Sequence, residues 1–464
     1  MISRLGLFIS RVFARTCPDP FVIAILLTVF TVILALSLGD YGEANQSLLA
    51  RATFLLDAWR ADGGLWKLLG FGMQMCLVLV TGHALASTRP VRALIDALAG
   101  WPTGTASAVV LVSGISCLAG LINWGLGLIV GALLAREVGQ NLTRRNVPVH
   151  YPLIAAAGYM GLLIFHGGLS GSAPLTATTA EAARRVLPES AVAMLDGGVS
   201  LDRTLLSPLN LFVTGGLLVI IPMLFWMLTP KHVNQMQGMD PQLLVRVPAP
   251  QPESTGKNIP DKLDRSPIVV WLLALPLLLA LIRYASVNGL ANLQLNEVNA
   301  AMLAMGLILH GSPRKYMTAV EAGASDCGAI IIQFPIYAGI MALMSSSGLV
   351  QKIAAGFTTI GDQNTIPVLS FLAATVVGFF VPSGGGQWSV QGPIALEIGS
   401  HAGIDQGKMI MTIAFGDELA NMLQPFWALP LLAITGVKAR DIVGYTALVM
   451  LVSGAWMALG LLLF

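Results

Sequence analysis

The sequence predicts an all-α protein that crosses a lipid bilayer several times, and three observations support this fold class. Of its 464 residues, 55% are hydrophobic and only 11% are charged, against roughly a quarter charged in an ordinary soluble domain. Apolar stretches of about 20 residues, the length that a helix needs to span a bilayer, recur along the chain. Glycines (49) and prolines (25) are abundant and often interrupt those stretches, which is typical of the broken helices that line a transport path.

The charge balance and the cysteines exclude several classes of protein. The charges of the 26 basic and 24 acidic residues nearly cancel, so the chain lacks the excess of basic residues that binds a polyanion. We therefore expect no nucleic-acid partner. The 4 cysteines lack the close spacing of a zinc site. We therefore predict no metal site and no cofactor.

Nine apolar stretches are predicted to span the membrane. The first is expected to be a retained span rather than a removed signal, because no small-residue cleavage site follows it. The predicted spans are 20–38, 65–87, 152–176, 205–228, 267–287, 297–311, 325–345, 409–436 and 441–463.

Two further stretches, 104–135 and 366–397, are too long for one span and too short for two. Each has a polar, glycine-rich centre, at 123–127 and 383–389. We interpret each stretch as a re-entrant hairpin of two half-length helices, whose ends stay on one side of the membrane. With the N-terminus inside, this topology keeps most Lys and Arg residues on the cytoplasmic side, as the positive-inside rule requires.

The two halves of the chain resemble each other. Residues 72–77 align with 331–336, and the same offset brings the two hairpin centres into near register. The proline-rich segment 229–266 predicts a polar, cytoplasmic linker between a first membrane repeat at 1–228 and a second at 267–464. Each repeat contains a hairpin followed by a broken helix. An odd number of membrane crossings separates the matching helices around 72–77 and 331–336. This predicts inverted repeats, the usual architecture of a secondary transporter.

Two adjacent acids lie in the apolar stretch of the second broken helix. A carboxylate at the bilayer centre costs about 2.5–3.5 kcal/mol, so Asp417 and Glu418 require neutralisation by a bound cation or a proton. We therefore place both acids in a cation or proton path, with Asn421 on the same helix face as Asp417. The alternative is that both acids cap a helix that begins nearer the membrane surface.

The matching part of the first half is polar but carries no carboxylate. His166 is a candidate proton carrier, although a hydrogen-bonded structural histidine is the alternative reading. Ser170 and Ser172 offer hydroxyls, and Asn123 lies at the first hairpin centre. These residues are candidates for substrate binding.

The second hairpin centre supplies glycines whose N–H groups can approach an anion closely. Tight packing is the alternative role of such a triplet. Amides around it complete the predicted site. Trp388 and Trp427, with Trp124 at the first hairpin centre, are predicted to form the wall of an apolar pocket, although tryptophans also anchor proteins at the membrane interface. The predicted substrate-binding residues are Asn123, Ser170, Ser172, Gly384, Gly385, Gly386, Gln387, Trp388, Gln391, Asn421, Gln424 and Trp427.

The two hairpin centres and the two broken helices contain no Lys or Arg. This favours a substrate with one negative charge that is accompanied by its own cation. The sequence therefore predicts a secondary transporter for small monocarboxylates, driven by H⁺ or Na⁺. One alternative is a carrier for another organic anion, such as a C4 dicarboxylate. A membrane-embedded acyl-processing enzyme is the other, and it is disfavoured because no nucleophile and base motif accompanies His166. No catalytic residue is predicted.

Three motifs resemble the short-chain fatty acid transporter family, which includes the bacterial acetoacetate and butyrate permeases. They are VPSGGGQWSVQGP at 381–393, GDELANMLQPFWALP at 416–430 and PDPF at 18–21. The resemblance implies uptake of short acyl carboxylates across a bacterial inner membrane by a multi-pass protein. It also implies kinship with the wider ion-transporter superfamily, whose members bind anions and cations at paired hairpin tips. Relatives of the family suggest a homodimer.

Overall fold

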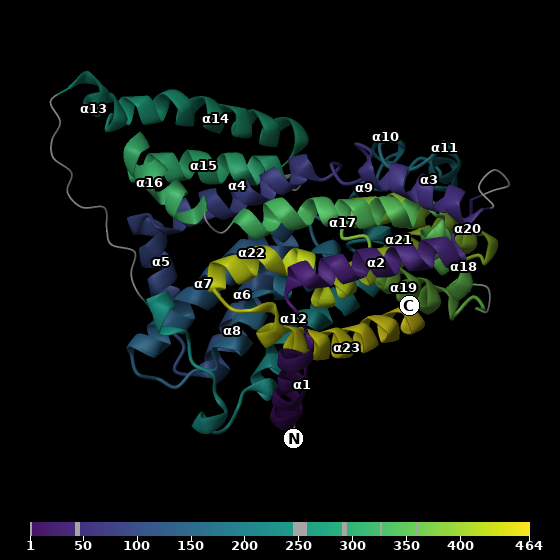
Figure 1. Ribbon diagram of the computed structural model, residues 1–464, viewed down its shortest axis with the longest axis horizontal. Helices are drawn as coiled ribbons and strands as arrows, with labels where there is room; N and C mark the ends of the chain where they lie inside the picture. Colours follow the sequence, from purple (N-terminus) through teal and green to yellow (C-terminus); the bar gives the residue numbers. More distant parts are fainter. Residues whose placement is uncertain (1, 42–46, 245–257, 290–294, 325–326, 359–360) are drawn as a thin grey trace.

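The computed structural model describes residues 2–41, 47–244, 258–289, 295–324, 327–358 and 361–464. Within these ranges the regular structure is entirely helical (Figure 1). The described residues include 7 helices that are long and apolar enough to cross a membrane. These are α2 (Pro20–Leu38), α4 (Leu69–Ala86), α6 (Thr105–Ile122), α12 (Pro208–Leu228), α14 (Pro267–Asn288), α17 (Gly328–Ser346) and α23 (Ala439–Leu463). The predicted class, an all-α multi-pass membrane protein, is confirmed.

The outer helices show the surface expected of a protein surrounded by lipid. Helix α14 exposes most of its apolar side chains, with Leu272 at 72% exposure. Beside it lies α15 (Leu295–His310), which corresponds to the short span predicted at 297–311. In Figure 1, α14, α15, α17 and α2 run in roughly the same direction. Burying so many apolar side chains against hydrocarbon is favourable, whereas exposing them to water is not.

Several shorter helices were not predicted, because the search for spans recognises only long apolar runs. They are charged, and most have one apolar face. Figure 1 shows the first of them, α1, lying across the direction of α23. They are α1 (Ile2–Thr16), α3 (Leu48–Arg60), α5 (Arg89–Gly100), α16 (Pro313–Ala324) and α18 (Leu349–Thr358).

The first predicted hairpin is formed by α6 and α7 (Trp124–Arg144). Its two ends lie together, because Arg145 Nη1 donates to the carbonyl of Pro102 at 3.0 Å. The two helices have 18 and 21 residues, so the expectation of half-length helices is wrong for this hairpin. At 1.5 Å per residue α6 alone is about 27 Å long, close to the thickness of a bilayer core.

Small residues let this hairpin pack closely on the helix that follows it. Ser116 Oγ donates to the carbonyl of Gly158 at 2.8 Å and accepts the N–H of Gly161 at 2.9 Å. A Cβ on Gly161 would lie 2.7 Å from the Ser116 carbonyl, closer than real side chains approach. The first hairpin is therefore fixed tightly against the first broken helix.

The second hairpin is formed by α19 (Ile366–Gly378) and α20 (Gly384–His401). Its outer ends are also adjacent, since Gln363 Nε2 donates to the carbonyl of Gly403 at 3.4 Å. Helix α19 has 13 residues and is too short to span a bilayer alone. This hairpin therefore has one of its two helices at the predicted half length.

The two hairpin tips have the same local structure. The second helix of each hairpin begins at an extended N-cap residue, Asn123 with φ −157° and Ser383 with φ −158°. Both side chains accept backbone N–H groups of the turn that follows, which satisfies donors that a helix start leaves free. The internal resemblance of the halves extends to these caps. The opposite orientation of the two repeats stays a prediction.

Both predicted broken helices are broken. Stretch 152–176 consists of α8, two 3₁₀ turns and α9, and stretch 409–436 consists of α21, one 3₁₀ turn and α22. The second break occurs just before Pro425, which lacks the N–H that would continue a helix. The helices are α8 (Tyr151–Gly158), α9 (Ser172–Thr176), α21 (Gln406–Ala420) and α22 (Pro425–Thr435).

The predicted linker 229–266 is described except for 245–257, which lie outside the described residues. Its first part docks on the first half of the chain: Gln140 Nε2 donates to the carbonyl of Leu243 at 2.8 Å, and the N–H of Tyr151 donates to Gln237 at 2.9 Å. The division into two repeats at this linker stays a prediction.

Candidate functional site

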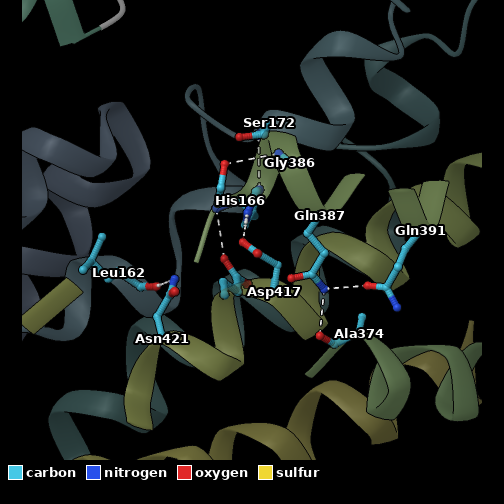
Figure 2. A network of polar contacts seen from close by, with 11 residues as sticks. Leu162, His166, Ser172, Ala374, Gly386, Gln387, Gln391, Asp417 and Asn421 are labelled. Carbon is cyan, nitrogen blue, oxygen red and sulfur yellow. Dashed lines mark hydrogen bonds and ion pairs between the residues drawn. The ribbon is translucent and has the colours of Figure 1, made fainter. Parts of the chain in front are cut away.

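A cluster of three buried titratable side chains joins the two broken helices. His166 comes from the 3₁₀ turn before α9, and Asp417 and Glu418 come from the last turn of α21. Their exposed fractions are 0%, 5% and 0%. His166 Nε2 lies 2.7 Å from Asp417 Oδ2 (Figure 2). The His166 backbone N–H donates to Glu418 Oε2 at 2.9 Å. The structure therefore brings all three predicted cation-path residues together.

The contacts of His166 define which of its nitrogens carries a proton. The backbone N–H of Ser172 donates to Nδ1 at 3.2 Å, so Nδ1 acts as an acceptor and is unprotonated. The remaining ring proton is then on Nε2, where it is donated to the Asp417 carboxylate. With its hydrogen bonds as they stand, His166 is a neutral imidazole that orients Asp417 without cancelling its charge.

Nothing among the described residues supplies a positive charge to the two acids. Neither Asp417 nor Glu418 forms an ion pair with a described Lys or Arg, and Glu418 Oε1 is buried without any hydrogen-bond partner. Two uncompensated carboxylates side by side in a buried site are too costly to persist. At least one of them must be neutralised by a proton or a bound cation during the working cycle. The described residues contain no group of three or more His, Cys, Asp or Glu that could hold a metal ion.

The tip of the second hairpin touches this cluster. A Cβ on Gly384 would lie 2.8 Å from His166 Nε2 and 3.1 Å from Asp417 Oδ2, so only glycine fits there. A Cβ on Gly385 would meet nothing within 4 Å. The N–H groups of Gly386 and Gln387 are used by Ser383, whereas those of Gly384 and Gly385 have no partner in the described structure. The tip thus presents two free donors beside open space.

The first hairpin tip differs, because its donors are already used. Asn123 Oδ1 accepts the N–H groups of Gly125 and Leu126, and Ser170 Oγ accepts the N–H of Trp124 at 2.9 Å. Ser172 lies in the half-exposed start of α9, near His166. Asn123 and Ser170 therefore hold the first tip in place, and the two tips are alike in backbone but not in free donors.

Two of the predicted amides use their N–H groups in hydrogen bonds and leave their oxygens without partners. Gln387 Nε2 donates to the carbonyl of Ala374 at 2.7 Å and to Gln391 Oε1 at 2.8 Å. Gln424 Nε2 donates to the carbonyl of Gly378 at 2.6 Å. Carbonyl groups only accept, so these contacts fix which end of each amide is nitrogen. Gln387 Oε1 and Gln424 Oε1 are left buried and unpaired, which is the arrangement of cation ligands rather than of anion donors.

Asn421, at the break of the second broken helix, is hydrogen-bonded to residues at the break of the first. Its Nδ2 donates to the carbonyl of Leu162 at 3.1 Å, and Tyr159 Oη donates to the Asn421 carbonyl at 2.9 Å. Sequence reasoning missed Tyr159, because it lies inside an apolar run with no polar neighbour to mark it. It also missed Ser383 as a cap, although a serine directly before a run of glycines is a recognisable helix start.

Two of the three predicted tryptophans meet in an aromatic cluster. The Trp124 and Trp427 rings are 5.1 Å apart, and Phe71 contacts both at 6.1 Å and 5.9 Å. Trp388 lies elsewhere: it is fully buried in α20 against Gly392, and none of the described ring contacts joins it to this cluster. The predicted apolar wall is thus built from Trp124, Trp427 and phenylalanines that the sequence did not single out.

Broken helices, two hairpins and a buried carboxylate cluster define a membrane transport protein. The short-chain fatty acid transporter family model matches residues 1–464, and the chain belongs to that family. A provisionally named short-chain fatty acid transporter of Escherichia coli K12 is 39% identical over 466 residues, covering 100% of both chains. Its counterpart in Haemophilus influenzae is 36% identical over 458 residues, covering 97% of each. The multi-pass fold and this family membership exclude the enzyme alternative.

Two solved structures of transporters are distantly similar. The Neisseria gonorrhoeae MtrF, described within a class of antimetabolite efflux pumps, has a TM-score of 0.40 and 16% identity, with 98% of this chain and 96% of that chain covered. The Alcanivorax borkumensis YdaH transporter has a TM-score of 0.42 and 16% identity, with 96% and 97% covered.

Proposed function

We propose that this protein imports short-chain monocarboxylates, such as butyrate or acetoacetate, together with H⁺ or Na⁺. The relatives are bacterial, which supports an inner-membrane location. The distribution of Lys and Arg favours a cytoplasmic N-terminus. The hairpin tips and broken helices would move against the remaining helices to expose the site to each side in turn. The homodimer that the family suggests stays a prediction.

The free donors at the second hairpin tip are the observation that carries this proposal. The N–H groups of Gly384 and Gly385 lie at the N-terminus of α20, where the helix dipole favours a negative charge. Gly385 borders open space, which leaves room for a small carboxylate at the tip. No described Lys or Arg ion-pairs at the cluster, which suits an anion of one charge better than a dicarboxylate.

The coupling cation would neutralise the acids behind that tip. A proton would reside on Glu418, whose Oε1 has no partner. A sodium ion would instead use the unpaired oxygens of Glu418, Gln387 and Gln424, since hard cations prefer oxygen ligands. Either cation makes substrate binding cooperative, because the bound carboxylate and the two acids would otherwise repel one another at close range.

Counterflow in proteoliposomes tests the substrate class. Liposomes loaded with unlabelled butyrate, acetoacetate or succinate are diluted into labelled butyrate, and exchange is followed over time. We expect butyrate and acetoacetate to drive exchange at similar rates and succinate to drive none. Strong exchange with succinate and none with butyrate would replace the proposal by the dicarboxylate alternative.

A further inference from the structure

A cavity of about 570 Å³ lies apart from the carboxylate cluster. It is enclosed by the connection between α1 and α2, the first turns of α17, and the segment that joins α22 to α23. Its volume is within the range of roughly 300–1,000 Å³ that ligand pockets usually have. The lining residues used below are Cys17, Asp19, Gln333, Leu429, Lys438 and Arg440.

The mouth of the cavity carries a net positive charge. Lys438 and Arg440 are exposed, and neither forms an ion pair with a described residue. Asp19 is the one acid among the lining residues, and its carboxylate already accepts the N–H of Phe21 at the start of α2, at 2.9 Å. Two cations against one acid leave the lining with a net positive charge, which attracts small anions.

The inner end of the cavity offers an unused amide. Gln333 lines the cavity with 4% of its surface exposed, and its Oε1 has no hydrogen-bond partner. Its Nε2 donates no hydrogen bond to a described residue either. A buried amide without partners is costly unless something binds to it in another state.

This inner end adjoins the aromatic cluster of the first hairpin tip. Phe334, the residue after Gln333, stacks on Phe426 with the ring centroids 4.0 Å apart. Phe426 contacts Trp427 at 5.0 Å, and Trp427 reaches Trp124 at the tip. The inner end of the cavity, at Gln333, therefore lies one residue along α17 from the aromatic cluster.

We propose that this cavity is a cytoplasmic vestibule that binds the short-chain carboxylate as a second, separate site. Lys438 and Arg440 attract the carboxylate, the Gln333 amide receives it, and Leu429 with its neighbours on α22 contacts the acyl tail. The inference rests on the proposed function for the identity of the ligand. It predicts that the substrate binds in this cavity on its way between the transport site and the cytoplasm.

Transport from the two sides provides the first test. In vesicles of known orientation, Lys438→Gln with Arg440→Gln should raise the half-saturating butyrate concentration on the cytoplasmic side about tenfold, since the loss of about 1.4 kcal/mol corresponds to that factor. The outer-side value should change less than about twofold on the same scale. The control is Lys315→Gln, an exposed cation of α16 that does not line the cavity. Equal effects on both sides, or none, would overturn the proposal.

Cysteine labelling provides a test that does not depend on transport. Cys17 lines the cavity and is partly exposed, whereas the other three cysteines are buried. A thiosulfonate converts a thiolate into a mixed disulfide and releases a sulfinate. The ratio of the rates at which an anionic and a neutral thiosulfonate modify Cys17 should fall at least about threefold in the Lys438→Gln, Arg440→Gln variant, because the anion loses its attraction. Butyrate should slow labelling of the wild type and not of this variant, and Cys17→Ser gives the background.

The two tests separate failure of the inference from failure of the proposed function. If wild-type protein shows no butyrate flux, the proposed function is wrong, and the labelling ratio still reports whether the cavity attracts anions. If flux is normal while the ratio is unchanged and butyrate gives no protection, the vestibule is wrong and the proposed function stands.

Discussion

Asp417→Asn is expected to abolish concentrative uptake while leaving the protein folded and inserted. The carboxamide keeps the shape of the side chain and still accepts the proton that His166 Nε2 donates at 2.7 Å, so packing is preserved. It removes the negative charge beside Glu418 that helps to hold the coupling cation there. Losing a charge next to a buried ion costs about 3 kcal/mol or more, which is roughly a hundred-fold in cation affinity.

The measurement is the internal concentration that labelled butyrate reaches in proteoliposomes under an imposed cation gradient. For Asp417→Asn it should rise only to the external concentration. Asp57→Asn is the matched control, because Asp57 forms an exposed pair with Arg60 at 2.9 Å and such pairs contribute little. An unchanged accumulation ratio in Asp417→Asn would remove this residue from the cation path.

Gly385→Val should block substrate binding without disturbing the fold. A Cβ at this position meets nothing within 4 Å, so we expect the fold to tolerate valine, whose methyl groups would take up the open space beside the free N–H groups of the tip. Losing two hydrogen bonds to a charged group at about 1.5 kcal/mol or more each would weaken binding by roughly a hundred-fold. The half-saturating butyrate concentration should rise accordingly.

The control for this variant is Gly215→Val in α12, where a Cβ also meets nothing within 4 Å and the residue is exposed. It should transport as the wild type does. Wild-type butyrate affinity in Gly385→Val would show that the open space beside the tip is not where the substrate binds, and that the glycines serve only packing against His166.

Much of the fold follows from the apolar pattern, because a membrane-spanning helix needs a run of apolar residues that few other structures require. Stretches 20–38, 205–228 and 267–287 correspond closely to α2, α12 and α14. The shorter amphipathic helices carry no such signal. Helix α5, with 12 residues and several charges, is stabilised by its place beside the hairpin rather than by its own composition.

The site was predicted in part, for a physical reason. Costly residues such as Asp417 and Glu418 are conspicuous in an apolar run, so the sequence could single them out. The sequence could not show that His166 would contact both acids, because that contact depends on how two broken helices cross. Nor could it show which end of the Gln387 and Gln424 amides faces the site, since the carbonyls that fix them belong to a different part of the hairpin.

The central claim is that a buried carboxylate cluster couples a monocarboxylate to a cation. Uptake of labelled butyrate by the wild-type protein, with proton and sodium gradients imposed separately at zero membrane potential, tests it most directly. The account predicts accumulation above the external concentration under one of these gradients and simple equilibration when both are absent. Butyrate flux that never exceeds equilibration under either gradient would contradict it.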